Sequence, residues 1–168
     1  MTQLYLVRHG ETVDNARQIM QGQTQGQLND EGIRQAQEVR DQLASEHFDA
    51  IVASDLRRSI QTATIIAEPH GLQVVTTPLL RERAWGDFTG MFIPSLKDVP
   101  WPDNVESLPL LKERARQFLH FILTQYPDQR ILAVGHGIIN KAIQSVHADK
   151  PMNEIMKMNN AEIRILKL

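Results

Sequence analysis

The chain has 168 residues, of which 42% are hydrophobic and 23% charged, which is ordinary for a soluble globular protein. Its formal net charge is -2, so no global excess of positive charge points to nucleic acid or to an acidic membrane surface. The absence of cysteine excludes disulfide scaffolds, thiolate metal sites and cysteine nucleophiles. No leader peptide and no apolar run of about 18 residues is visible, so we expect a cytoplasmic protein.

The first half of the chain predicts three strands and two helices. A buried strand at 4–7 stops at a turn, and a Gly- and Gln-rich stretch at 21–27 reads as a surface loop. Asn29 is a good helix N-cap, and a second strand at 48–53 ends before Ser54. A third strand is expected at 72–76. The apolar faces of the two helices are predicted from spacing as Ile33, Ala36, Val39 and Leu43, then Leu56, Ile60, Ala63, Ile66 and Ala67.

The second half begins with irregular chain. Residues 78–90 are dense in charge, and 91–105 read as a short insertion without strong periodicity. A long helix then ends before Pro127, followed by a buried strand at 131–134, a helix at about 138–146 and a last strand near the end. The buried face of the long helix is predicted as Leu108, Leu111, Ala115, Phe118 and Ile122.

Alternating strands and helices with short connections predict an α/β fold, a three-layer sandwich with a mainly parallel central sheet flanked by helices. Neither an internal repeat nor a composition shift marks a boundary. We therefore expect one domain spanning 1–168, with the insertion at about 91–105.

Three of the strands end in turns that contain arginine or histidine, the side chains suited to binding or attacking a phosphate. The first ends at Arg8 and His9, the second leads to Arg57 and Arg58, and the fourth ends at His136 between two glycines. The carboxyl ends of parallel strands share one edge of the sheet, so these side chains are expected to meet in one pocket. Arginine forks and helix N-termini favour phosphate, and a neutral imidazole is a nucleophile near neutral pH.

Five ordered motifs make the chain resemble the histidine phosphatase superfamily, which includes the cofactor-dependent phosphoglycerate mutases. They are the segment 8–12 with Asn15, the segment 54–63, the segment 80–90, the pair Glu106 and Ser107, and the segment 134–137. The likeness spans the whole chain in the right order. A lone Arg-His-Gly would be weak evidence, whereas the ordered set is specific.

The resemblance implies a role for ten residues. His9 would attack the phosphoryl group and become a phosphohistidine, Arg8, Arg58 and His136 would bind its equatorial oxygens, and Glu82 would serve as general acid and then base. Further contacts to phosphate would come from Asn15 and the backbone of Gly137, and contacts to the organic part of the substrate from Gln21, Gly22 and Arg83. No metal and no cofactor is expected, because arginine and histidine supply the positive charge.

Plainer explanations compete at some positions. Arg57 stands beside Arg58, and Glu82 lies between Arg81 and Arg83, where it could form only a surface ion pair. The sequence also departs from the family at three positions. Gly135 replaces a frequent serine, Ile138 a common glycine, and Trp85 the tyrosine of the mutases, which puts recognition of a three-carbon substrate in doubt.

A phosphatase acting on a small phosphorylated metabolite is favoured over a mutase. The insertion is short, Lys97 is its only basic residue, and the chain ends directly after the last strand, so a closed basic lid is not expected. A non-catalytic phosphate-binding protein is the third hypothesis. No nucleic-acid or membrane partner is expected, and an apolar patch around the insertion is compatible with a homodimer.

Overall fold

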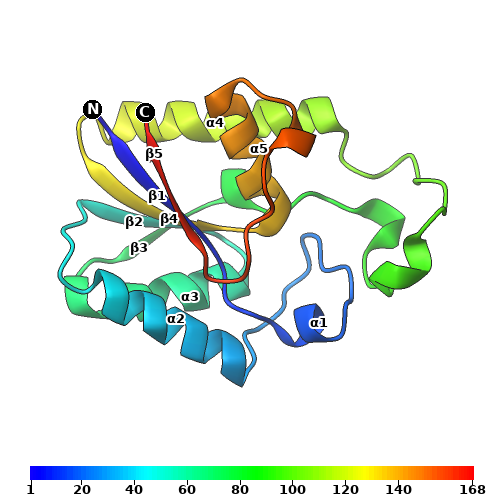
Figure 1. The fold of residues 1–168 in the computed structure, drawn as a ribbon, viewed down its shortest axis with the longest axis horizontal. Helices are drawn as coiled ribbons and strands as arrows, with labels where there is room; N and C mark the ends of the chain where they lie inside the picture. The colour runs from blue at the N-terminus through cyan, green and yellow to red at the C-terminus, as the bar shows by residue number, and fades with distance from the viewer.

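A computed structural model describes residues 1–168 as a five-stranded sheet with helices on both faces (Figure 1). The strands are β1 (Gln3–Arg8), β2 (Ala50–Ser54), β3 (Val74–Thr77), β4 (Arg130–Gly135) and β5 (Ile163–Lys167). The helices are α1 (Val13–Ala16), α2 (Asp30–Leu43), α3 (Arg57–Ala67), α4 (Leu108–Gln125) and α5 (Gly137–Ala148). Single 3₁₀ turns occur at Glu68–His70, Pro78–Leu80, Gly86–Phe88, Ile93–Leu96 and Met152–Glu154. The predicted strands and longer helices all form, with ends shifted by one or a few residues.

The sheet is mainly parallel, as predicted. Its strand order is β3-β2-β4-β1-β5; the first four strands are parallel, and β5 runs antiparallel beside β1. Arg8 of β1 is in register with Gly135 of β4, and Val134 is in register with Ala53 of β2. The three turns that follow β1, β2 and β4 and contain the candidate site residues therefore start at the same edge of the sheet.

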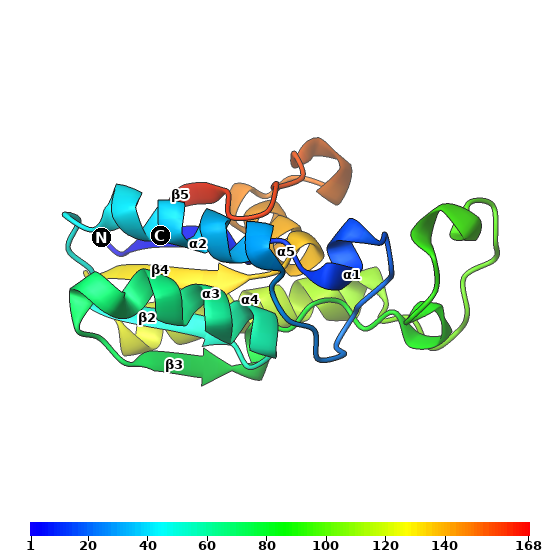
Figure 2. The same ribbon diagram turned by 90° about the horizontal axis from the view of Figure 1, so that it is seen from below.

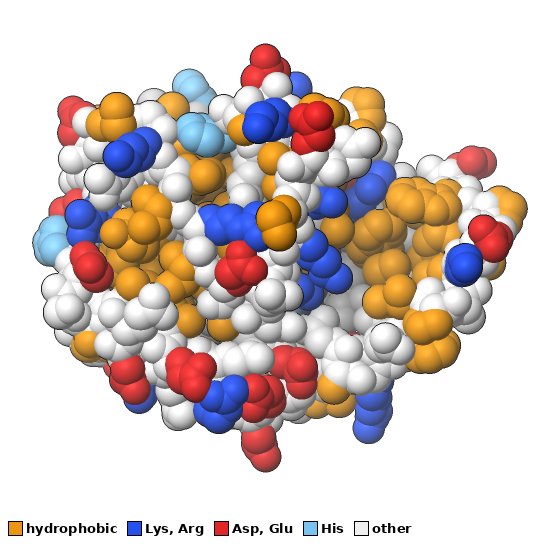
Figure 3. All heavy atoms as spheres, viewed as in Figure 1, with side chains coloured by type: hydrophobic (Ala, Val, Ile, Leu, Met, Phe, Trp, Pro, Cys, Tyr) orange, Lys and Arg blue, Asp and Glu red, His pale blue; other side chains and the backbone are white.

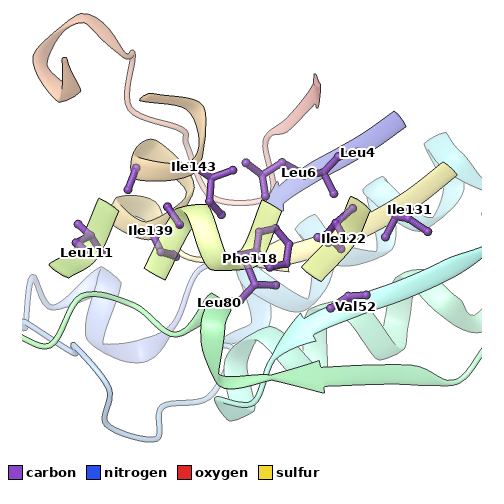
Figure 4. Packing of buried hydrophobic residues seen from close by; sticks show 13 residues of the cluster. Leu4, Leu6, Val52, Leu80, Leu111, Phe118, Ile122, Ile131, Ile139 and Ile143 are labelled. Carbon is purple, nitrogen blue, oxygen red and sulfur yellow. The ribbon is translucent and has the colours of Figure 1, made fainter. Parts of the chain in front are cut away.

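Two apolar layers enclose the sheet, with α4 and α5 on one face and α2 and α3 on the other (Figures 1 and 2). Successive residues of β1 alternate between them. Leu4 and Leu6 pack against α4 and α5 around Phe118 (Figure 4), whereas Tyr5 and Val7 face α2 and α3. Strands buried on both faces explain the continuous apolar runs in the sequence.

The start of α2 differs from the prediction. Asn29 is the N-cap and accepts a hydrogen bond from the backbone N–H of Gly32, but Ile33 is 37% exposed. Gly32 is the buried residue at the start of the helix. It packs so closely against the loop after β1 that a Cβ would lie 2.0 Å from the backbone oxygen of Glu11. The face of the helix is set by this close backbone approach to the loop after β1.

Two loops extend beyond the carboxyl edge of the sheet and are joined to each other (Figure 1). The backbone N–H of Met20 donates to the oxygen of Met91 at 2.9 Å, that of Gly90 to Met20 at 2.7 Å, and that of Ile93 to Gln18 at 2.8 Å. Apart from the turn Ile93–Leu96, the insertion has no regular structure. None of the helices has the length and apolar character needed to cross a bilayer.

Candidate active site

A cavity of about 250 Å³ opens at the carboxyl edge of the sheet, between the strand ends and the two joined loops. Eight of the ten predicted residues line it: Arg8, His9, Asn15, Gln21, Gly22, Arg58, Glu82 and Gly137. His136 and Arg83 do not. The remaining wall is mostly apolar and includes Trp85.

His9 follows β1 directly, and 3% of it is exposed. Its Nδ1 lies 2.6 Å from the backbone oxygen of Gly10. A carbonyl can only accept, so Nδ1 carries the proton and the neutral ring keeps a free electron pair on Nε2. Burial, and then the positive charges of Arg58 and Arg8, lower the pKa of His9 well below its ordinary value. The ring is therefore neutral at neutral pH.

His136 is a neighbour of His9, stands at the N-cap position of α5, and is completely buried. The two ring centroids are 5.0 Å apart, with the planes at 64°. Its Nε2 is 2.9 Å from Oγ of Ser54 and 3.1 Å from Oγ of Ser59, whereas Nδ1 has no hydrogen-bond partner in the protein. Burial lowers its pKa strongly, with the charge of Arg58 next in importance.

Arg58 is the buried member of the Arg57 and Arg58 pair; Arg57 is exposed. Its guanidinium donates to the backbone oxygens of Thr24 and Gly22, both at 2.7 Å, and its Nε is buried without a partner. Burial lowers the pKa of Arg58 to about 10, so the group stays charged at neutral pH. These contacts also bury Gly22 and its neighbour Gln21, although the sequence predicted a solvated loop there.

Arg8 forms the other cationic wall. It donates to the backbone oxygen of Met158 at 2.8 Å, and its Nε is buried and unpaired. Arg8 packs directly over Gly137, where a Cβ would make an ordinary contact at 3.4 Å with the guanidinium carbon. Arg8, Arg58 and His136 thus each hold one buried ring or guanidinium nitrogen that no protein group satisfies.

Glu82 reaches the site from a segment without helix or strand. Its carboxylate accepts hydrogen bonds from three backbone N–H groups: those of Ile138 and Ile139 at the start of α5, both at 3.0 Å, and that of Arg83 at 2.8 Å. The neighbouring arginines are engaged elsewhere. Arg81 forms a bidentate pair with Asp55, which lowers the pKa of that carboxyl group. Glu82 is therefore oriented by the helix N-terminus and not by a surface ion pair.

Arg83 does not line the cavity. Its Nε donates to the backbone oxygen of Glu106 at 2.8 Å, and its guanidinium carbon lies 5.1 Å from the ring centroid of Trp85 and 5.0 Å from that of Trp101. These are cation–π distances. The positive charge expected beside the organic part of the substrate is thus engaged by two tryptophan rings.

Sequence reasoning did not select several residues that complete the site. Ser59 contacts His136, and Oγ1 of Thr62 accepts a hydrogen bond from the backbone N–H of Gly10 at 3.1 Å. Lys157, from the segment before β5, lines the cavity. For the two residues of α3 the available signal was their place within a turn of Arg58; for Lys157 the sequence carries no signal.

One departure from the family pattern has a structural cause. A Cβ on Gly135 would lie 2.2 Å from Oδ1 of Asn140, whose Nδ2 donates to the backbone oxygen of Val7 at 3.1 Å. Glycine at position 135 and asparagine at position 140 are therefore matched to each other. No group of three or more histidine, aspartate or glutamate side chains is arranged to hold a metal ion.

Comparison with known proteins agrees with this geometry. Residues 4–168 match the model of the histidine phosphatase superfamily (branch 1). The chain is 35% identical over 166 residues to the uncharacterised phosphatase PhoE of Bacillus subtilis (strain 168), covering 96% of this chain and 86% of that one. It is 47% identical over 152 residues to the probable phosphoglycerate mutase GpmB of Yersinia pestis (strain Pestoides F), covering 82% and 71%.

Among solved structures, a mycobacterial glucosyl-3-phosphoglycerate phosphatase in complex with VO3 superposes with a TM-score of 0.91 at 28% identity, covering 98% of this chain and 92% of that chain. The fold, the converging strand ends and the family match lead to one conclusion. This chain belongs to the histidine phosphatase superfamily, branch 1.

Proposed function

We propose that the protein is a phosphomonoesterase that acts on a small phosphorylated metabolite through a phosphohistidine at His9. One observation carries the proposal: Arg8, Arg58 and His136 surround His9, and each holds a buried nitrogen without a partner. An unsatisfied buried donor is costly, so three of them around one imidazole favour an anion with several acceptor oxygens. A phosphoryl group has that chemistry.

The first half-reaction uses the neutral imidazole. The electron pair on Nε2 of His9 attacks phosphorus, and the bond between phosphorus and the alcohol oxygen breaks. Glu82 gives its proton to that oxygen, so the alcohol leaves uncharged. Charge that builds on the equatorial oxygens is met by Arg8, Arg58 and Nδ1–H of His136, while the hydroxyls of Ser54 and Ser59 hold its Nε2.

The second half-reaction reverses the roles. Water attacks phosphorus, the carboxylate of Glu82 takes a proton from it, and the bond to Nε2 of His9 breaks. Inorganic phosphate leaves, and Glu82 has regained its proton. Asn15 and the backbone N–H of Gly137 add donors at the margin of the same cavity.

A mutase is the second candidate, since the relative with 47% identity is described as a probable phosphoglycerate mutase. Two observations favour the phosphatase. Lys97, the only basic residue of the insertion, does not line the cavity, and Arg83 is held by Trp85 and Trp101. A mutase must hold a carboxylated phosphate while it reorients, and neither of these positions supplies a cation to the cavity, which leaves Lys157 as its one lysine.

The test combines two ³¹P NMR experiments. With alkyl phosphates the wild type should release inorganic phosphate, and rapid quenching in base should trap an acid-labile label that His9→Asn lacks. With 3-phosphoglycerate and 2,3-bisphosphoglycerate, phosphate release should exceed isomerisation; faster isomerisation would establish the mutase instead. Phosphate binding with neither label nor turnover would mean a non-catalytic binding protein.

Glu82→Gln separates the acid role from the rest of the site. The variant should still form phosphoenzyme from an aryl phosphate, whose leaving group needs no proton, and should be slowed about 10²- to 10⁴-fold on an alkyl phosphate. Equal losses on both substrates would refute the role of Glu82.

A further inference from the structure

The cavity has an apolar half that the phosphoryl chemistry does not use. Ile19, Met20, Trp85, Ile93 and Ile138 line it, beyond the histidine and arginine side chains. We propose, on the basis of the function above, that the substrate is a phosphomonoester whose alcohol part is apolar and carries no carboxylate. Figure 3 shows hydrophobic side chains gathered at the right of the view, facing Lys and Arg side chains near the centre across a hollow.

The wall replaces groups that a polar substrate would need. Trp85 and Ile138 are two of the three departures from the family pattern noted in the sequence, and both line the cavity. The guanidinium of Arg83 is already engaged by the backbone oxygen of Glu106 and by the two tryptophan rings. A carboxylate placed against this wall would lose its hydration without gaining a fork of donors.

Ring packing and backbone hydrogen bonds support the wall. The ring of Trp85 packs edge-on against Trp101, with centroids 5.5 Å apart and planes at 69°, and Trp101 packs in the same way on Phe88 at 6.3 Å. The paired backbone hydrogen bonds between Met20 and the segment 90–91 fix the opposite side. A preformed apolar surface binds an apolar group without the cost of ordering side chains.

Two features could direct the alcohol elsewhere, and the experiment must address both. Lys157 is exposed at the rim and could attract a carboxylate. A neighbouring hollow of about 510 Å³ shares Arg8, Asn15 and Lys157 with the cavity and is lined mainly by polar side chains that could bind hydroxyl groups. Ile93 is the one hydrophobic residue that lines this hollow, whereas five hydrophobic residues line the cavity around Trp85.

Matched substrates isolate the apolar contact. Ethyl, butyl and hexyl phosphate differ in chain length but have leaving groups of similar basicity, so demands on the acid are equal. Each buried methylene is worth about fourfold, and partial burial of four more should raise kcat/KM at least about tenfold from ethyl to hexyl. Hexyl phosphate should also exceed 5-(phosphonooxy)pentanoate, of similar length, by at least about tenfold.

Two variants locate the effect. Trp85→Ala should remove most of the dependence on chain length, whereas Phe92→Ala, an aromatic side chain that is 48% exposed and does not line the cavity, should keep it. If Trp85→Ala fails to fold, binding of the non-hydrolysable ethyl- and hexylphosphonates to the wild type gives the same gradient.

Several outcomes would overturn the proposal: a flat series in both kcat/KM and phosphonate affinity, preference for the pentanoate that Lys157→Met removes, or preference for a hexitol phosphate over hexyl phosphate. In each of these cases phosphate release still occurs, so the phosphatase function stands. Failure of that function looks different, because no substrate would then give phosphate or a label at His9.

Discussion

Arg114 of α4 offers the sharpest test of how the fold holds Glu82. Its side chain is 16% exposed and pairs at 2.8 Å with Glu106, which is 13% exposed. The same guanidinium donates to the backbone oxygens of Leu79, Arg81 and Glu82. The chain from the 3₁₀ turn at Pro78–Leu80 to Glu82 is thus fastened to a helix of the core at three backbone oxygens.

Replacing Arg114 with methionine keeps the length of the side chain but removes every one of these bonds. Breaking one partner of a buried ion pair costs about 3–5 kcal/mol, and the slight exposure of this pair places it near about 3 kcal/mol. For a chain of this size we expect Tm to fall by about 6–12 °C. Glu82 would also lose its position at the start of α5.

The kinetic readout separates positioning from stability. Below Tm, Arg114→Met should lower kcat for an alkyl phosphate at least about tenfold while changing an aryl phosphate little, because only the alkyl leaving group needs the acid. Arg116→Met is the control on the same helix, since Arg116 is 55% exposed and contacts only Glu113 at 3.3 Å. Equal effects on both substrates, or an unchanged alkyl rate, would refute the reasoning.

Three further changes test other contacts. Gly135→Ser should cost about 1–3 kcal/mol of unfolding free energy in the wild type and less in an Asn140→Ala background, where the 2.2 Å clash is gone; equal costs would contradict the match between the two positions. Gly32→Ala should destabilise the chain and lower kcat/KM, because its Cβ would meet a backbone oxygen of the loop that carries the nucleophile; thermal unfolding and phosphate release measure both, and a neutral effect would refute the contact. Burial lowers the pKa of His9 and of His136 in the folded protein below the ordinary value of 6.5, so the unfolded chain binds more protons below that pH and stability falls as the pH is lowered. Urea titrations from about pH 7 to about pH 5 should show a loss of up to about 1.4 kcal/mol per pH unit below 6.5 for each histidine, and substitution by asparagine should flatten the slope.

Most of the helices and strands could be predicted from the sequence, because the spacing of apolar residues reflects which face of each element is buried. In α4, Leu111, Ala115, Phe118 and Ile122 are completely buried, as their spacing predicted. Leu108, in the first turn, is 40% exposed, because the start of the helix extends past the core. Spacing identifies the face of a helix but not where its neighbours end.

The polar part of the site was harder to read. Ser59 and Thr62 are completely buried beside Arg58, but hydroxyl side chains at helical spacing are equally compatible with a solvated face. Arg83 fits the motif, yet its guanidinium is held by Glu106 and by two tryptophans, of which Trp101 lies in the insertion and has no periodic signal. Motifs placed the residues that begin each turn, whereas packing of irregular segments decided where the long side chains point.

The contacts of Arg58 have a thermodynamic consequence. Its charge is met by the dipoles of two loop carbonyls and forms no ion pair, while Glu82 and Asp14 attract it only from a longer distance, so folding confines a cation that is only partly neutralised. An anion that binds beside this cation relieves the unfavourable free energy of burying it. Binding of orthophosphate or vanadate should therefore stabilise the folded protein and raise its Tm. The loop at 22–24 would share in that gain, since it is anchored by the same guanidinium.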